Sequence, residues 1–170
     1  MVTIKSLFKR KFKSEYFPEN AYFDASNICE KTKNIKLLGD EEIIVTIDNE
    51  PDTEVIDCCM FTNKRIIIIK NNAIRFMDYY DIDNFELPDE KTICDKRYED
   101  PKMNRSDKAK IHLINGDSEE IRIIYGGIYL LASVLKNPAI KKHWVTGHTV
   151  RADVNILFAH GRRDSFVFDA

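Results

Sequence analysis

Between residues 41 and 124 the apolar positions follow the two-residue period of β-strands. Apolar side chains alternate with polar ones, or form short runs that end at turn-forming residues. We expect strands at seven places: residues 43–47, 55–61, 65–70, 73–79, 82–87, 108–114 and 121–124. The strongest of them, residues 65–70, contains four consecutive isoleucines. Such a run of β-branched side chains suits a strand that is covered on both faces.

Two tight turns connect neighbouring strands in this pattern. Asn71-Asn72 separates two strand runs by two residues, and asparagine tolerates the left-handed backbone of a hairpin turn. Asn115-Gly116 is the strongest hairpin signal in the chain. Residues 48–52 are a turn by composition, and the polar stretch 88–106 is expected to be a long loop.

Helical spacing of apolar residues occurs at both ends of the strand region. Residues 1–17 predict a short amphipathic helix, which Pro18 should interrupt. A weaker helix is expected at residues 24–36. After Gly126-Gly127, a helix to about Lys136 is expected to cover a sheet. The apolar stripe of the first helix consists of Ile4, Leu7, Phe8 and Phe12, and that of the last helix of Ile128, Leu131, Ala132 and Leu135.

The predicted elements divide the chain into three parts. Residues 1–36 form an N-terminal helical extension, and residues 37–137 form a mainly β domain of seven antiparallel strands followed by a helix. Residues 138–170 form a C-terminal extension with alternating apolar positions, among them Phe158, Phe166 and Phe168. This extension is either an extra hairpin or a tail that becomes ordered on a partner, and these three aromatic residues are the candidate partner contacts.

Composition and charge narrow the classes of function. The chain has 170 residues, of which 44% are hydrophobic, which is enough for the core of one domain. Its 26 Lys and Arg residues nearly balance 28 Asp and Glu residues, so we expect no nucleic-acid partner. No stretch has the roughly 18 apolar residues of a membrane span. The first residues lack the apolar run of about 7–15 residues of a secretory signal. We therefore expect a cytoplasmic protein.

Several short motifs resemble a known family. Residues 38–44, Leu-Gly-Asp-Glu-Glu-Ile-Ile, are followed by residues 59–68, at whose centre lies Thr-Asn-Lys-Arg. Tyr-Asp-Ile at residues 80–82 and the hairpin of residues 111–117 come next. In this order the motifs resemble those of bacterial PH-like and GRAM-like domains, over roughly residues 37–137. The resemblance implies a pleckstrin-homology-like barrel of about seven antiparallel strands capped by a C-terminal helix. It also implies a function in protein contacts or oligomerisation.

The chain departs from the phosphoinositide-binding members of this family at the loop after the first predicted strand. Those members have cations there, which neutralise phosphate groups. Here the loop contains carboxylates, which would repel a polyphosphorylated headgroup. We therefore expect no phosphoinositide binding at this loop. The carboxylates are those of Asp48, Glu50, Asp52, Glu54 and Asp57.

Lys64 and Arg65 have two interpretations. The Thr62 and Asn63 side chains can hold a tight turn by bonding to nearby backbone, and Arg65 can lay its stem on the sheet and reach a carboxylate. In this interpretation, which we favour, Lys64 and Arg65 are structural. In the other interpretation they contact a ligand.

The sequence contains none of the common enzyme signatures, such as a P-loop, GxGxxG, GxSxG or HExxH. The histidines and cysteines also lack metal-binding spacings, and we expect no catalytic residue, metal or cofactor. The cysteines are expected to be small buried hydrophobes, with the adjacent pair on opposite faces of a strand. These residues are His112, His143, His148 and His160, and Cys29, Cys58, Cys59 and Cys94.

These observations favour a non-enzymatic binding or scaffold module that acts through a protein partner or through self-association. An exposed strand edge or the aromatic C-terminal extension would make the contact by strand addition. The alternative is a peripheral membrane module whose N-terminal helix adsorbs to an anionic surface through its cations. A small metal-dependent or histidine-based enzyme is the least favoured hypothesis. The candidate membrane contacts are Lys9, Arg10, Lys11 and Lys13.

Overall fold

The computed structural model describes residues 2–71, 73–87 and 107–137. The predicted strands and the last helix are present, and one short strand precedes them. Most bounds agree to within two residues, but the strand expected at residues 121–124 is Ser118–Arg122. Three 3-10 turns lie at Ser14–Tyr16, Glu30–Thr32 and Tyr79–Asp81. In chain order, the helices and strands are α1 (Ile4–Lys11), β1 (Tyr22–Asp24), β2 (Ile43–Asp48), β3 (Asp57–Thr62), β4 (Arg65–Lys70), β5 (Ala73–Asp78), β6 (Ile82–Glu86), β7 (Lys108–Leu113), β8 (Ser118–Arg122) and α3 (Gly127–Leu135).

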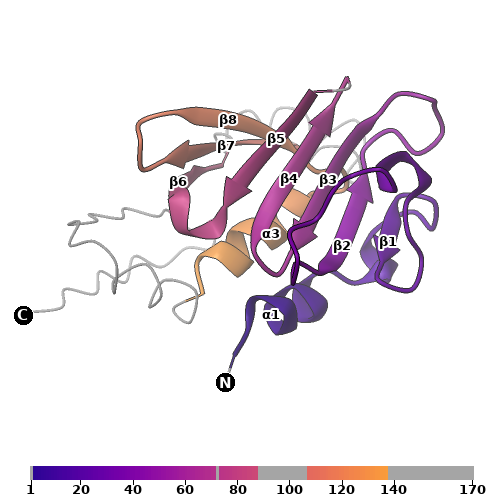
Figure 1. Ribbon diagram of the computed structural model, residues 1–170, viewed down its shortest axis with the longest axis horizontal. Coiled ribbons are helices and arrows are strands. Elements are labelled where there is room, and N and C mark those ends of the chain that lie inside the picture. The colour runs from indigo at the N-terminus through magenta and orange to yellow at the C-terminus, as the bar shows by residue number, and fades with distance from the viewer. Residues whose placement is uncertain (1, 72, 88–106, 138–170) are drawn as a thin grey trace, which may run out of the picture.

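The strands form two antiparallel sheets (Figure 1). One has the order β1-β2-β3-β4-β5, and the other has the order β6-β7-β8. The mainly β class expected from the sequence is therefore confirmed. Over the described ranges no strand pairing joins the two sheets, so the strands do not close into one barrel.

The helix expected at residues 24–36 is wrong. The chain instead forms β1, in which Phe23 lies opposite Thr46 of β2, and then the 3-10 turn Glu30–Thr32. At the end of β1 the Asp24 carboxylate accepts hydrogen bonds from the backbone N–H of Ser26 at 2.8 Å and from its hydroxyl at 2.6 Å. Such local side-chain bonds compete with a helix, because they satisfy the backbone in a turn.

Helix α1 lies at one end of the sheets, at the bottom of Figure 1, and its apolar side chains belong to the main core. The predicted amphipathic helix is confirmed, although it ends at Lys11, well before Pro18. Its apolar residues Leu7 and Phe8 are at most 1% exposed. The ring of Phe8 stacks on that of Phe61 in β3, with the centroids 4.9 Å apart. The first helix is therefore held by the same core that holds the two sheets together.

The hairpin of β3 and β4 is buried on both faces, as the run of isoleucines predicts. Ile66, Ile67, Ile68 and Ile69 are all buried. The inner face of the hairpin joins the core shared with α1, α3 and the three-stranded sheet. The outer face forms a second, smaller core. As expected, the adjacent cysteines point to opposite sides, Cys59 into the first core and Cys58 into the second.

Backbone conformations at the predicted turns agree with the sequence. Asn71 has a φ of 49°, and Gly116 has a φ of 91°, so the left-handed turn residues lie where the two hairpins require them. Before α3, Gly126 is also left-handed, with a φ of 71°. A Cβ on Gly127 would lie 2.3 Å from a side-chain carbon of Ile123. The Gly-Gly pair thus provides a sharp turn and a close approach of α3 to the sheet.

We predict that Phe8→Ala will lower the free energy of unfolding by about 3–5 kcal/mol, because it removes a fully buried ring and leaves a cavity. Chemical denaturation followed by circular dichroism measures this change. Tyr16→Ala is the matched control, since that ring is 47% exposed, and it should change the value by less than about 0.5 kcal/mol. Equal effects of the two substitutions would contradict the placement of α1 in the core.

Candidate functional site

The outer face of the five-stranded sheet is only partly covered. Residues 23–37 lie over β3 and β4, where Phe23, Ile35 and Leu37 pack against the second core. The sequence predicts a helix at residues 24–36, within this covering segment (residues 23–37), but the segment covers the sheet as extended chain and short turns. The segment shields apolar side chains from solvent, because β3 and β4 have apolar residues on the outer face as well as on the inner face.

Strand β5 contains the uncovered part of this face. Ile74 and Phe76, which we call the β5 patch, are 40% and 50% exposed, although they lie opposite the buried Ile69 and Ile67 of β4. Within the described residues β5 pairs only with β4 and forms the last strand of its sheet (Figure 1). An apolar surface therefore lies beside a strand edge whose outward backbone groups have no partner strand.

Arg65 connects the β5 patch to a buried ion pair. Its guanidinium lies over the ring of Phe76, 4.2 Å from the centroid, and donates two hydrogen bonds of 2.9 Å to the Glu41 carboxylate. Glu41 also accepts bonds from the Thr62 hydroxyl and from the backbone N–H of Leu38, each at 2.8 Å. Burial opposes ionisation of Glu41, but these hydrogen bonds outweigh it and lower its pKa.

Lys64, the other candidate ligand contact, is also bonded within the chain. Its ammonium pairs with the carboxylate of Asp40, and Asn63 bonds to the backbone on both sides of Glu41. The structure therefore places Lys64 and Arg65 in the turn and strand-start positions that the favoured interpretation gives them. Both cations have protein carboxylates as partners in this arrangement.

Two cations from other parts of the chain, Lys31 and Arg122, pair with three carboxylates of the acidic loop between β2 and β3. Arg122 at the end of β8 donates to Glu50 at 2.6 Å and to Asp57 at 3.2 Å. Asn49 is buried in the same loop, where its side chain bonds to Asp57, to the backbone oxygen of Arg122 and to the backbone N–H of Ile124. The loop thus joins the two sheets. Its engaged carboxylates and its paired arginine offer no cluster of free cations for a headgroup.

The cations of the N-terminal helix occupy the surface, while its apolar side chains do not. Lys9, Arg10 and Lys13 are exposed, and Lys11 is half-buried. Lys13 pairs with Glu15 at 3.5 Å. Leu7, Phe8 and Phe12 lie in the core, so the helix has no apolar face with which to enter a lipid surface in this conformation.

The candidate residues of the C-terminal extension, Phe158, Phe166 and Phe168, lie outside the described residues, as do Cys94 and three of the four histidines. His112 is described, and its Nε2 lies 2.9 Å from the carboxylate of Glu86 on β6. Because His112 is the one histidine among the described residues, the described ranges do not test a grouping of histidines.

Buried thiols meet a carboxylate beneath the covering segment. The sulfurs of Cys29 and Cys58 and a carboxylate oxygen of Asp48 all lie within 4.8 Å of one another. A hydrogen bond from Cys58 lowers the pKa of the Cys29 thiol to about 7, while that bond and burial raise the pKa of Cys58. The Lys31 ammonium lies 2.7 Å from Asp48. Of the residues described, Cys29, Asp48 and Cys58 form a group that could hold a metal ion.

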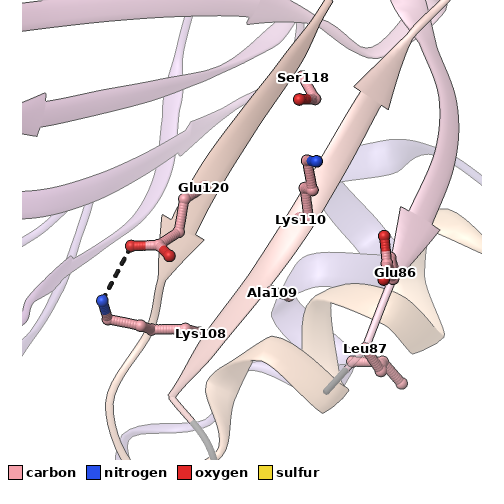
Figure 2. Close-up of a pocket in the computed structure, with 7 residues that line it drawn as sticks. All are labelled: Glu86, Leu87, Lys108, Ala109, Lys110, Ser118 and Glu120. Atoms are coloured by element: carbon pink, nitrogen blue, oxygen red, sulfur yellow. Dashed lines mark ion pairs between the residues drawn. The ribbon is translucent and has the colours of Figure 1, made fainter. Parts of the chain in front are cut away.

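The polar outer face of the three-stranded sheet is hollowed into a pocket of about 520 Å³. Figure 2 shows its lining, in which Lys108 and Glu120 form an ion pair of 3.0 Å. Lys110 and Ser118 lie on the same face, and Glu86 and Leu87 lie at the end of β6. This lining offers paired surface charges. The cross-strand partner of Ser118 is His112, whose Nε2 lies 2.9 Å from the Glu86 carboxylate.

Comparisons with known proteins identify no relative. No family model, no curated protein and no solved structure matches this chain. In the described part of the chain, no helix has the length and apolar character needed to span a membrane.

Sequence reasoning missed the residues that structure brings together here. These residues come from three segments with no recognisable metal-binding spacing: Cys29 and Lys31 from the covering segment, Asp48 from β2 and Cys58 from β3. The one signal in the sequence was the adjacent Cys58-Cys59 pair, which indicated a strand with two buried faces. Phe76 was visible as part of a strand, but its exposure depends on where the covering segment ends.

We predict that Glu41→Gln will destabilise the protein by about 3–5 kcal/mol, because it leaves Arg65 largely buried without its charge partner. Glu42→Gln, which changes the neighbouring surface carboxylate, should lower the free energy of unfolding by less than about 1 kcal/mol.

The contribution of Glu41 to stability should also depend on pH. Since the folded-state pKa of Glu41 lies below the ordinary 4.5, this contribution is present above pH 4.5 and is lost as pH falls through the lowered pKa. Denaturant titrations between acidic and neutral pH should show that the free energies of unfolding of the wild type and Glu41→Gln converge at low pH. A constant difference would contradict this role.

Proposed function

We propose that the chain is a non-enzymatic binding module that associates with a second copy of itself through β5. The observation that carries this proposal is the β5 patch, an exposed apolar pair on a strand edge that pairs only with β4 in the described residues. Edge strands with apolar side chains are templates for strand addition, because their backbone groups and side chains both gain partners.

The order of elements supports a PH-like arrangement for this module. A four-stranded meander, β2 to β5, is followed by a three-stranded meander, β6 to β8, and then by α3. This is the order of strands and helix that the sequence resemblance implies, with α1 and β1 as additions. We propose that the module belongs to this PH-like class, whose resemblance implies protein contacts.

The sequence of β5 favours a second copy as the partner. In an antiparallel pairing of two β5 strands that keeps both outer faces on one side, the longest overlaps centre on Arg75 or on Phe76. Centring on Arg75 would place two arginines directly opposite each other, which destabilises a strand pair. Among the described residues each arginine has one carboxylate partner, Glu119 of β8, at 3.5 Å. Centring on Phe76 places two exposed rings together at the two-fold axis, an arrangement worth about 0.5–1.5 kcal/mol beyond burial. One register is thereby preferred.

The membrane alternative receives less support from this structure. Surface adsorption by an amphipathic helix needs apolar side chains at the interface as well as cations. In α1 those side chains are Leu7 and Phe8, and both are buried. Binding of the protein to anionic vesicles, abolished by removal of residues 1–17, would favour this alternative over self-association.

We predict that the full-length chain is a dimer and that Phe76→Asp makes it a monomer, because charges at the axis would face each other. Light scattering coupled to size-exclusion chromatography over a range of concentrations measures the molar mass. Tyr16→Asp, which changes another exposed ring, should remain dimeric.

A chain that ends at residue 138 separates β5 from the C-terminal extension as the contact. Dimerisation through β5 should survive this truncation. A monomeric full-length chain at every concentration, or a dimeric Phe76→Asp variant, would overturn the proposal. Loss of the dimer on truncation alone would assign the contact to Phe158, Phe166 and Phe168 instead.

A further inference from the structure

Three potential metal ligands converge between the covering segment and the sheet, and the proposed self-association does not involve them. Cys29 lies just before the 3-10 turn Glu30–Thr32, Asp48 ends β2, and Cys58 lies in β3. Their two sulfurs and a carboxylate oxygen all lie within 4.8 Å of one another, and all three residues are buried. From this geometry we propose that Cys29, Asp48 and Cys58 bind a thiophilic divalent cation, Zn²⁺.

The donor atoms favour zinc over other common cations. Metal–sulfur bonds of about 2.3 Å and metal–oxygen bonds of about 2.0–2.2 Å place tetrahedral ligands roughly 3.5–4 Å apart. The observed cluster therefore reaches this geometry with small side-chain movements. Thiolates do not suit Ca²⁺ or Mg²⁺, which take oxygen ligands, whereas two thiolates and one carboxylate suit Zn²⁺. Three protein ligands leave one tetrahedral position for a water molecule.

Neighbouring groups hold the Asp48 carboxylate in place, as the second shell of a metal site does. Its Oδ1 accepts a hydrogen bond of 3.0 Å from the backbone N–H of Glu50, and its Oδ2 lies 2.7 Å from the Lys31 ammonium. Lys31 is fixed in turn by the backbone oxygens of Glu50 and Val55, at 2.7 and 3.1 Å. Such partners orient a ligating carboxylate and increase metal affinity.

Charge is also balanced when a divalent cation binds. Two thiolates and one carboxylate give −3, and Lys31 adds +1, so the four side chains sum to −2 and a divalent cation makes the site neutral. A buried site with no net charge avoids the large cost of an uncompensated ion.

Metal binding would fasten the covering segment to the sheet. Cys29 belongs to that segment, whereas Asp48 and Cys58 belong to strands that it covers. A cation held by all three links residues that are far apart in the sequence, and its binding free energy adds to the stability of the fold.

The test is a titration of the full-length protein, reduced and freed of metal with a chelator, with Co²⁺ alone. We expect a near-ultraviolet thiolate-to-cobalt absorption that saturates at about one equivalent, and its loss when Zn²⁺ replaces the Co²⁺. Cys29→Ser and Cys58→Ser should each weaken binding at least about tenfold. Cys59→Ser is the matched control, since that thiol points into the other core, and Cys94→Ser tests the remaining cysteine.

A measurement on the unaltered protein keeps the proposal testable if a variant does not fold. X-ray absorption of the zinc-loaded wild type should show two sulfur ligands, with oxygen or nitrogen in the remaining positions, and zinc should raise the thermal midpoint. Absence of binding by the reduced protein, or binding that survives loss of both Cys29 and Cys58, would overturn the site. A Cys29–Cys58 disulfide in a chain that binds no metal when reduced would overturn it too, and would assign the pair to oxidation.

Discussion

The central hairpin of β3 and β4 is apolar on both faces, and this double burial constrains the rest of the structure. A strand that presents Cys58 and Met60 to one side and Cys59 and Phe61 to the other needs cover on both. The inner side receives α1, α3 and the three-stranded sheet. Within residues 2–71, 73–87 and 107–137, the outer side receives only the covering segment. The fold is therefore layered unequally, with a large core on one side of the sheet and a thin one on the other.

Polar groups at the ends of these buried strands are paired with one another over long distances in the sequence. Glu41 is matched by Arg65, Asp57 by Arg122, and Asp48 by Lys31. Each pairing joins segments that the hydrophobic layers have already brought together, because a buried charge without a partner would cost several kcal/mol. The ion pairs thus define how the covering segment, the acidic loop and the last strand dock onto the hairpin.

The sequence predicts the strands after β1 because each of them has a local signal. The isoleucines of residues 66–69, the turn at Asn71 and the turn at Gly116 specify alternation and reversal within a few residues. The prediction for the covering segment was wrong because its conformation depends on distant residues. Strand β1 pairs with β2, and Phe23 packs against the outer core. The same dependence hid the thiol cluster, whose members are assembled by that docking, and left the question of a closed barrel to the tertiary structure.

The thin outer layer connects the two surfaces on which our proposals rest. Where the covering segment lies over β3, it brings Cys29 to Cys58 and encloses Asp48 with Lys31. Over β5, Ile74 and Phe76 remain exposed although their partners in β4 are buried. A second β5 strand would continue this sheet beyond its last strand, and its Phe76 would cover the first. The same physical demand, cover for an apolar outer face, thus favours an intramolecular site at one end of the face and an intermolecular contact at the other.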